Sequence, residues 1–358
     1  MSDWSWVEAN MKEWQERGDE ERMRLPGFYS DAFGFRETDP DRAFAIFSEG
    51  KQLAEQLHEP WWVLFYEKYR IDALIHFKRD YRHVLDMAVQ CALEVRKPLN
   101  ATFPGRFGIF DSLVAAYLGI DPEGYAKPIQ EALDYLEAEI PPGPESDRYL
   151  LLARKRIFAL DLELYDEAYQ ACMNELHLAS SDRKQSTAIH FATFVYCALC
   201  QVAAAKGVWE AVGEYAETGE KLARHVGHEC ELSEVLAWQA VAALQAGELE
   251  KARRGYRTAT AHMDRLQMPP KQGYFDALAT YHQTTGDLDK AVKVRDRELE
   301  SIRDRGRLYY DCKVRIKRCR LLAQLDRLEE ADLDAARASA RKLRLPDKHL
   351  VAIEQIAG

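Results

Sequence analysis

The sequence is poor in residues that break regular structure, since only 19 of its 358 residues are glycine and 13 are proline. No alternating apolar run is bounded by Asn-Gly or Asp-Gly, the usual mark of a β-hairpin, so nothing indicates strands. With 47% hydrophobic residues, the chain has ample apolar side chains for a packed core. Disordered and collagen-like classes are therefore excluded.

An export signal and long apolar segments are also missing. No run of eighteen or more purely apolar residues occurs, and the opening MSDWSWVEAN lacks both the basic and the apolar region of a secretory signal. The seven cysteines are an odd number, in a chain that is large enough to fold without disulfides. We therefore expect a cytoplasmic protein with free thiols and no membrane partner.

Local motifs for catalysis, phosphate binding or metal binding are absent as well. Cys197 and Cys200 form a Cys-x-x-Cys, but they lie inside an apolar helical run, which favours core cysteines over a redox or zinc pair. His225, His228 and Cys230 cluster in RHVGHECE without a fourth ligand at a recognisable spacing, so a polar connector is favoured over a metal site. We expect no catalytic residue, no metal and no cofactor.

A repeat is the strongest positive signal. An apolar helical stretch, a short turn and a small residue recur, most clearly in GELEKA, GDLDKA, LDRLEEA and LELYDEA. The small residues fall at 43, 84, 126, 168, 212, 252, 291 and 331, so successive copies are 39 to 44 residues apart. Helix-breaking positions recur with the same period, at Pro60, 98–104, 141–144, 180–185, Gly227, 269–270, Gly306 and Pro346. Each interval therefore predicts two helices joined by a tight turn.

One such hairpin cannot bury its apolar face alone, so neighbouring hairpins are expected to stack. The spacing predicts an all-α superhelix of about eight helix-turn-helix units over residues 39–345. Residues 1–38 are expected to form an amphipathic helix, with the stripe Trp4, Val7, Met11 and Trp14, and an aromatic capping loop. The alternative for this aromatic region is a partner-binding patch. Residues 346–358 are expected to be a C-terminal tail or capping helix.

The repeat resembles the tetratricopeptide repeat. The segment from Gly286 to Ala291, GDLDKA, is similar to the Gly-Asp-Tyr-Asp-Glu-Ala of that family's second helix. Phe275, Leu278 and Ala279 are similar to its first-helix pattern. The resemblance covers about residues 40 to 345, although these repeats are longer than the family's roughly 34 residues. It implies a right-handed α-solenoid whose first helices line a concave groove that recognises a protein or peptide.

Charge is distributed unevenly along this array. Residues 303–344 carry a local net charge of +6, whereas the whole chain carries −10. In some tetratricopeptide arrays, basic residues at two first-helix positions clamp a peptide carboxylate, and the matching positions are Lys313 and Lys317, with Arg320 on the same face. A solvated basic face is the alternative. The residues that we expect to face the groove are Arg154, Gln201, Trp238, Asp276, Thr280, Gln283, Lys313, Lys317 and Arg320.

These features predict a non-catalytic scaffold, adaptor or regulatory sensor that binds a protein or peptide along its concave groove. An acidic segment of the partner would suit the basic end of the array. The alternative is a nucleic-acid-binding protein, or a regulatory subunit of a larger enzyme complex, that uses the basic C-terminal repeat. The overall negative charge disfavours nucleic acid as a partner. A further alternative is an enzyme whose site is assembled from distant residues.

Overall fold

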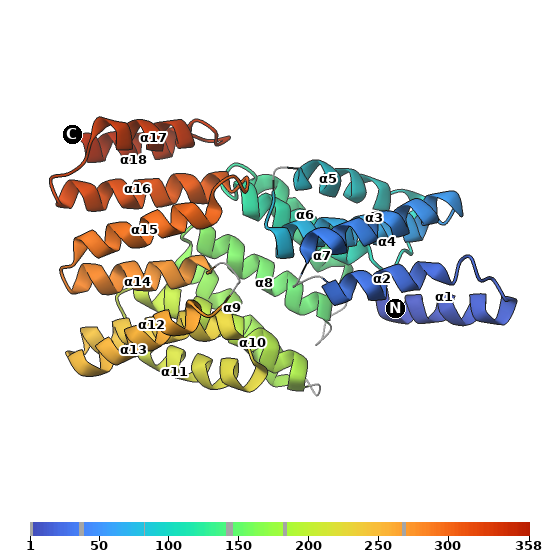
Figure 1. Cartoon of the computed structure of the whole chain (residues 1–358), viewed down its shortest axis with the longest axis horizontal. Helices are drawn as coiled ribbons and strands as arrows, with labels where there is room; N and C mark the ends of the chain where they lie inside the picture. The colour runs from blue at the N-terminus through green and yellow to red at the C-terminus, as the bar shows by residue number, and fades with distance from the viewer. Residues whose placement is uncertain (1–2, 36–38, 82, 141–145, 182–184, 267–269) are drawn as a thin grey trace. The chain divides into compact units, whose positions relative to one another are not determined.

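The computed structural model describes residues 3–35, 39–81, 83–140, 146–181, 185–266 and 270–358. Their regular structure is entirely helical, without a strand (Figure 1). The predicted all-α class is therefore confirmed. The predicted breakers at 141–144, at 182–184 and at Pro269 lie outside the described residues.

Packing divides the chain into two compact units, although the repeat spacing suggests one continuous array. The first unit comprises Met1–Ile120 and Ala126–Ile140, and the second comprises Asp121–Tyr125 and Pro141–Gly358. The first unit contains α1 (Asp3–Arg17), α2 (Arg24–Phe35), α3 (Pro40–Gln56), α4 (Pro60–Asp72), a π-helical segment (Ala73–Lys78), α5 (Val84–Val95), a short 3-10 helix (Pro98–Asn100), α6 (Arg106–Ile120) and α7 (Ala126–Glu139).

The second unit contains five consecutive helical hairpins and a final helix. They are α8 (Ser146–Asp161) with α9 (Tyr165–Ser181), α10 (Gln185–Ala205) with α11 (Trp209–Val226), α12 (Glu229–Gln245) with α13 (Leu249–Met263), α14 (Gln272–Thr284) with α15 (Leu288–Ile302), α16 (Leu308–Gln324) with α17 (Glu330–Ala340), and α18 (Asp347–Ala357). Each hairpin packs on the next, as expected of stacked repeats.

Aromatic side chains make the core of the first unit. Trp6, on α1, is 6% exposed, and its ring centroid lies 4.8 Å from that of Trp62 and 6.0 Å from that of Phe103. Trp14 is also buried and lies 5.6 Å from Trp62. The side chain of Trp4 lies outside the described residues. The N-terminal tryptophans that the structure describes therefore close a core and leave no open aromatic patch at these positions.

The segment that the sequence analysis treats as an aromatic loop is helix α2. Pro26 is tolerated because it lies in the first turn, where backbone N–H groups have no partner within the helix. The buried hydroxyl of Tyr66 donates a hydrogen bond to the carbonyl of Leu25 at the start of this helix. Tyr66 also packs directly against Gly50 of α3, where an added Cβ would lie 2.6 Å from the ring. Close packing on α3 and α4 therefore outweighs the loop-like composition.

The small residues of the repeat mark the fourth position of the second helix in the hairpins. Ala168, Val212, Ala252 and Ala291 occupy that position in α9, α11, α13 and α15, and each is completely buried. The prediction fails in the last hairpin, where Ala331 is exposed. There α17 begins at Glu330, so Leu333 takes the fourth position and is buried instead.

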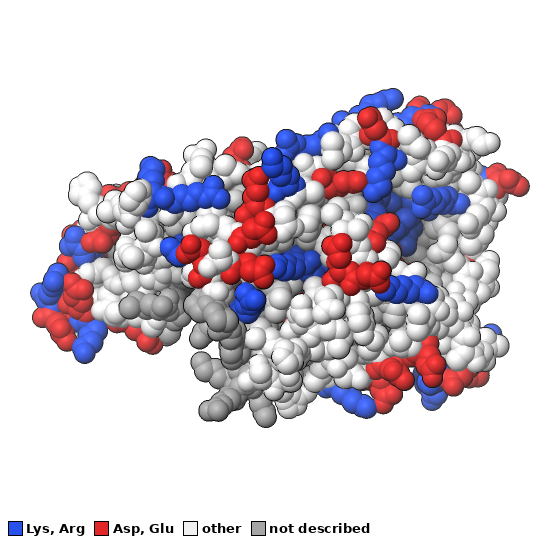
Figure 2. Space-filling model, turned by 180° about the vertical axis from the view of Figure 1, so that it is seen from behind, with Lys and Arg blue, Asp and Glu red and all other residues white. Residues whose placement is uncertain are grey.

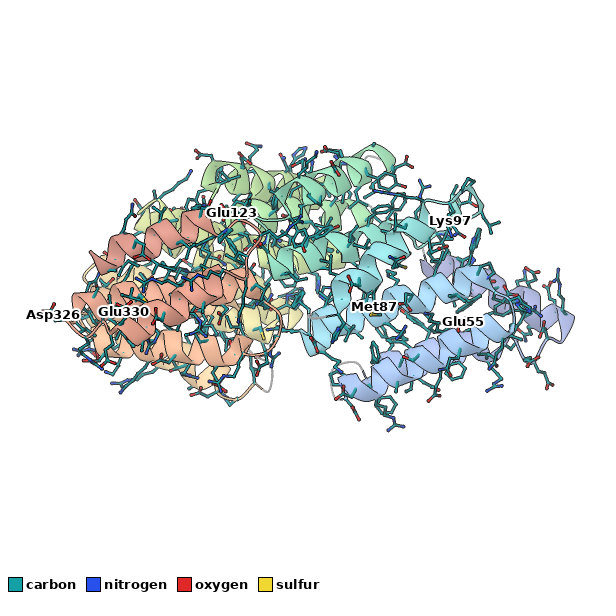
Figure 3. All side chains as sticks on the ribbon, turned by 90° about the horizontal axis from the view of Figure 1, so that it is seen from above. Glu55, Met87, Lys97, Glu123, Asp326 and Glu330 are labelled. Carbon is teal, nitrogen blue, oxygen red and sulfur yellow. The ribbon has the colours of Figure 1, made fainter. Side chains whose placement is uncertain are left out.

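The turns inside the hairpins use left-handed backbone conformations. Gly207, Gly247 and Gly286 have φ angles of 71°, 79° and 77°. In the first and last hairpins of the second unit, Glu163 and Asp326 take the corresponding role with φ angles of 61° and 52°. Figure 3 shows Asp326 in the turn before α17. A side chain in this conformation is strained, so both positions have a local cost that glycine avoids.

Two further local features differ from simple sequence expectations. Serine is a common helix cap, but Ser233 lies inside α12, where its hydroxyl donates to the carbonyl of Glu229. Helix α10 contains one window, Ala188–Ala205, that is long and apolar enough to cross a membrane by length and composition. More than half of this window is buried, and α10 packs on α9, α11 and α12.

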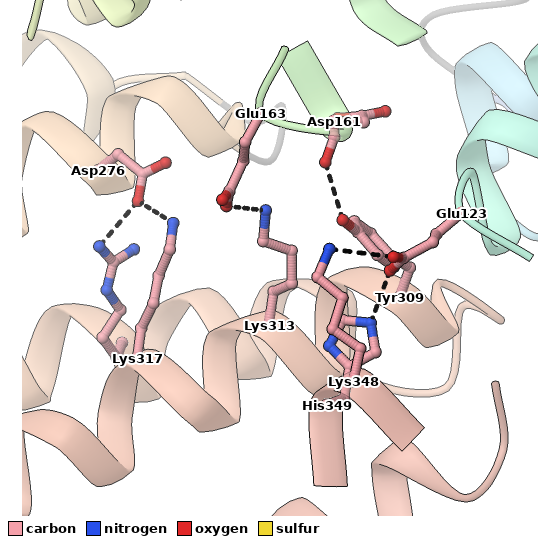
Figure 4. Close-up of polar contacts among 10 residues, drawn as sticks. Glu123, Asp161, Glu163, Asp276, Tyr309, Lys313, Lys317, Lys348 and His349 are labelled. Carbon is pink, nitrogen blue, oxygen red and sulfur yellow. Dashed lines mark hydrogen bonds and ion pairs between the residues drawn. The ribbon is translucent and has the colours of Figure 1, made fainter. Parts of the chain in front are cut away.

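The segment Asp121–Tyr125 is attached to the C-terminal end of the second unit. Asp121 is buried, and its carboxylate accepts hydrogen bonds from the backbone N–H groups of Gly124 and Arg344. Glu123 contacts the side chains of Lys348 and His349 on α18 at 3.0 and 2.9 Å (Figure 4). These contacts fix α18 against the segment.

Candidate peptide-binding groove

A cavity of about 430 Å³ lies within the second unit. Its walls come from the first helices α10, α12, α14 and α16, from the turn between α8 and α9, and from the starts of α9 and α11. The lining residues are Leu160, Asp161, Glu163, Tyr165, Gln201, Ala204, Ala205, Trp209, Trp238, Gln272, Asp276, Thr280, Gln283, Arg295, Tyr309, Tyr310, Lys313, Lys317, Arg320, Leu321 and Gln324. The cavity is thus lined mainly by polar and aromatic side chains.

Helical periodicity explains why two helices contribute most of the polar wall. On α14, Asp276, Thr280 and Gln283 follow each other at intervals of four and three residues. On α16, the same intervals separate Lys313, Lys317 and Arg320, and Gln324 follows after four more. Residues three or four apart lie on one face of a helix, so each row points to the same side.

The cations in the middle of the cavity are neutralised by a buried network. Oδ1 of Asp276 lies 2.7 Å from Lys317 Nζ and 2.7 Å from a guanidinium nitrogen of Arg295. Arg295 also contacts Glu298 at 2.6 Å. Burial opposes ionisation of Asp276, but Lys317 and Arg295 outweigh it and hold the pKa of this carboxyl well below its usual value. Lys317 is therefore an internal partner and not a free cation.

Lys313 is paired as well, with a residue 150 positions earlier in the chain. Its amino group contacts Glu163, in the turn between α8 and α9, and the neighbouring Tyr309 donates a hydrogen bond of 2.8 Å to the carbonyl of Asp161 (Figure 4). Burial raises the pKa of Glu163, but the charge of Lys313 lowers it further, so the net shift is downward. These contacts join the first hairpin of the second unit to α16.

Other polar groups at the cavity are uncommitted. Arg320, Gln283 and Gln324 are exposed, and within the described part of the chain their side chains have no hydrogen-bond or ion-pair partner. Trp238 is only 3% exposed, and its buried indole N–H has no hydrogen-bond partner among the described residues. A buried donor without an acceptor is costly, so a bound carbonyl or carboxylate oxygen would compensate it.

Two carboxyl groups at or beside the cavity have raised pKa values. Burial raises the pKa of Asp161 to about 6, although Tyr310 donates a hydrogen bond to it. Burial also raises the pKa of Glu234 to about 7, although Lys271 and a hydrogen bond from Gln201 act in the opposite direction. The Gln201–Glu234 distance is 2.8 Å. Near neutral pH, both groups are therefore partly protonated.

The cavity brings together eight of the nine residues that the sequence analysis expects in the groove, and Arg154 is the exception. Their role in binding remains a prediction. In the basic run at Arg154, the last residue, Arg156, is buried against Glu175 at 2.7 Å, so it supports the packing of α8 on α9. Sequence reasoning missed Asp161, Glu163, Arg295 and the two tyrosines of α16. A signal existed for Glu163, because it stands where the three middle hairpins have a turn glycine.

The cysteines and the candidate metal ligands are not grouped as a metal site among the described residues. All seven cysteines are free and buried. Among the described residues, no group of three or more His, Cys, Asp or Glu side chains is placed to hold a metal ion. On the face shown in Figure 2, acidic and basic side chains are interleaved.

Comparisons with known proteins bear on the fold. No family model matches the sequence, and no curated protein matches it. Among solved structures, the chain is similar to a Rap protein whose crystal structure contains competence and sporulation factor. The two are 14% identical with a TM-score of 0.52, and the match covers 94% of this chain and 99% of that one. This similarity and the stacked hairpins confirm the predicted tetratricopeptide-like helical-repeat architecture.

Proposed function

We propose that the chain is a non-catalytic regulatory protein of the cytoplasm that binds a short peptide segment in the cavity of its second unit. The observation that carries the proposal is the convergence of unpaired polar groups from successive first helices on one cavity. The Rap protein complexed with competence and sporulation factor supports a regulatory binding role for this architecture. The proposal needs no cofactor.

The cavity suits an extended peptide by its length and polarity. From Gln272 to Gln283, α14 lines it over twelve residues, whose ends lie about 16 Å apart at 1.5 Å per residue, which matches about five residues of extended chain. The amides of Gln283 and Gln324 can donate to peptide carbonyls and accept from peptide N–H groups. Arg320 is the cation available to a carboxylate.

The paired lysines determine where an acidic group of the peptide would bind. Lys313 and Lys317 are occupied by Glu163 and Asp276, so an acidic ligand has to displace these carboxylates or bind elsewhere. Arg320 requires no such exchange. We therefore assign an acidic side chain or terminal carboxylate of the peptide to the Arg320 end. The same pairing gives no support to a nucleic-acid footprint on α16, because that role requires cations free to contact phosphates.

The experiment is a selection from a positional-scanning library of hexapeptides that lack tryptophan and have free C-termini. Trp209 and Trp238 both line the cavity, so their fluorescence reports a peptide bound there. We expect saturable binding of the selected peptide and a change of emission. We expect Arg320→Gln to weaken binding about tenfold when an acidic group is present, since a charge-assisted hydrogen bond contributes about 1.5–3 kcal/mol.

Arg257→Gln is the matched control, because Arg257 is also an exposed arginine but lies on α13, outside the cavity lining. It should leave the affinity unchanged. Equal losses in the two variants would show a nonspecific effect of net charge. If no library peptide binds even at millimolar peptide concentration, the proposed function is wrong.

A further inference from the structure

A second groove lies on the other side of the second unit's middle hairpins. It has a volume of about 960 Å³ and runs over α12 between α11 and α13. Leu236, Ala240, Ala242 and Ala243 of α12 line its base, where each is at most 9% exposed. The peptide-binding cavity shares only Trp209 with it, so the two surfaces are almost entirely distinct.

The groove is open because small residues replace the tyrosines of the preceding hairpin. The fifth residue of α9 is Tyr169 and the seventh of α11 is Tyr215, and burial and the neighbouring Tyr169 raise the pKa of Tyr215. In the next pair of helices, the fifth residue of α11 is Gly213 and the seventh of α13 is Gly255. Both glycines line the groove. The position between α9 and α11 is thus filled. Between α11 and α13, an added Cβ on Gly213 would meet only the Ala242 methyl group, at 3.7 Å, so this position is open. An added Cβ on Gly255 would lie 3.3 Å from Ala240, so Gly255 packs closely on α12.

The following hairpin shows the same contrast. Counted back from the turn glycine, Ala242 and Ala243 of α12 correspond to Tyr281 and His282 of α14. Tyr281 stacks on Tyr256 of α13, with ring centroids 4.6 Å apart, and the Tyr256 hydroxyl lies 2.8 Å from His282. Aromatic side chains therefore fill the neighbouring positions on both sides, whereas the groove over α12 lacks such a side chain at Gly213.

The rims of the groove differ in charge. On α11, Glu210, Glu214, Glu217 and Glu220 lie at intervals of four, three and three residues, whereas α13 contributes Lys251 and Arg254. Glu217 and Glu220 are paired with Lys221 and Arg224 on α11 itself. Within the described residues, the carboxylates of Glu210 and Glu214 have no ion-pair or hydrogen-bond partner. The α11 rim therefore presents two free negative charges to a partner.

A helix suits this groove better than an extended strand. The groove is bounded by helices, whose backbone groups are already hydrogen-bonded, so a strand would find no backbone partners. A helix satisfies its own backbone and can insert one row of side chains. From Glu210 to Glu220 the rim is eleven residues long, or about 15 Å from end to end, which matches about three helical turns.

We propose that this groove docks an amphipathic helix of a partner protein. The helix inserts a large apolar side chain beside Gly213 and Ala242 and places a row of lysines or arginines along Glu210 and Glu214. This surface is independent of the peptide-binding cavity. It gives the protein a second contact, through which a bound peptide and a protein partner can be held at the same time.

The test uses a fluorescein-labelled, hydrocarbon-stapled helical peptide of roughly 14 residues, or about four turns. One face carries leucines and one edge carries lysines, and a matched peptide has glutamates in place of the lysines. Fluorescence anisotropy should show saturable binding of the lysine peptide to the full chain. The glutamate peptide should bind at least about tenfold more weakly, because its charges oppose those of the α11 rim.

Two groups of variants locate the binding. Gly213→Tyr introduces the side chain found at the equivalent position of α9 and should weaken binding at least about tenfold. Gly213→Ala should bind normally, because the added Cβ would meet only the Ala242 methyl group at an ordinary 3.7 Å. Glu210→Gln with Glu214→Gln changes only exposed groups and should weaken binding about threefold to tenfold. Arg320→Gln, in the other cavity, should have no effect.

Several outcomes would overturn the proposal. They are equal binding of the two peptides, no saturable binding, or full binding by a folded Gly213→Tyr variant. Light scattering that shows a concentration-dependent dimer abolished by Gly213→Tyr would assign the groove to a second copy of the chain instead. If Gly213→Tyr does not fold, as judged by circular dichroism, the exposed double glutamine variant decides alone.

Discussion

Lys317 Nζ and a guanidinium nitrogen of Arg295 each lie 2.7 Å from the same oxygen of Asp276. A carboxylate on α14 therefore joins cations from α15 and α16. The basic row of α16 consequently has a structural role at its centre. Among the described residues, Arg320, at the far end of this row, is the basic residue that lines the cavity without an ion-pair partner.

Removal of the Asp276 charge should destabilise the second unit. Asp276→Asn leaves Arg295, which is 5% exposed, with Glu298 as its remaining anionic contact. We expect a loss of about 3 kcal/mol in the free energy of unfolding, at the lower end of values for broken buried pairs. Asp289→Asn is the control, because Asp289 pairs with Arg327 at the surface and should cost less than about 1 kcal/mol. Urea denaturation measures both, and equal costs would contradict the account.

Glu163 should restrain Lys313 at a cost in backbone strain. Glu163→Gly places glycine at a φ of 61°, as in the turns at Gly247 and Gly286. Relief of about 1 kcal/mol of strain should offset the lost ion pair, so stability should stay nearly constant. An acidic peptide should bind up to about fivefold more tightly because Lys313 is released.

Glu163→Gln separates these two effects. It removes the charge but retains the left-handed conformation of a residue with a side chain. The variant should therefore show the same gain in peptide affinity and about 1 kcal/mol less stability than Glu163→Gly. Peptide titrations and thermal melts would measure the two effects. An unchanged affinity in both variants would show that Lys313 does not respond to the ligand.

Glu234 should make stability depend on pH. Its pKa is about 7 in the folded chain, against 4.5 for an ordinary glutamate, so between these values the folded state holds a proton that the unfolded state has lost. Stability therefore falls as pH rises from about 4.5 to about 7. Glu234→Gln stays neutral, so it should be more stable than the wild type at pH 8 by up to about 3 kcal/mol.

The advantage of Glu234→Gln should shrink towards pH 5, where Glu234 is protonated in the folded state. Thermal melts at pH 5 and pH 8 test this sign. A difference that is independent of pH would indicate that the substitution acts through packing and not through titration.

Substitution of Gly50 should lower the free energy of unfolding of the first unit. An added Cβ would lie 2.6 to 2.9 Å from three atoms of the buried Tyr66 ring, so Gly50→Ala should cost about 1–3 kcal/mol. Gly27→Ala, in α2, meets no atom within 4 Å and should be neutral or stabilising by up to about 1 kcal/mol. Denaturation of the two variants would measure the difference. Equal stability would contradict the packing of Tyr66 on α3.

Local periodicity explains the part of the fold that the sequence predicts well. Ala252 and Ala291 identify the second helices because a small residue is needed where two helices of a hairpin approach closely. The rows on α14 and α16 follow from 3.6 residues per turn. Failures occur where packing outweighs local signals, as in α2, whose Pro26 and glycines suggest a loop, and at Ala331, where the helix begins later.

Long-range pairing explains what the sequence analysis missed at the cavity. Lys313 and Glu163 are 150 residues apart, and no local pattern connects them. Arg295 lies on a second helix, and the resemblance assigns the groove to first helices only. The groove over α12 was also missed, because it becomes visible only when Gly213 and Gly255 are aligned with Tyr169 and Tyr215 on packed helices.

The most direct measurement is a crystal structure of the chain with the peptide selected from the hexapeptide library. The account predicts the peptide extended in the cavity between α14 and α16, with an acidic group at Arg320 and an oxygen near the indole N–H of Trp238. A peptide bound elsewhere, including the groove over α12, would contradict the central claim.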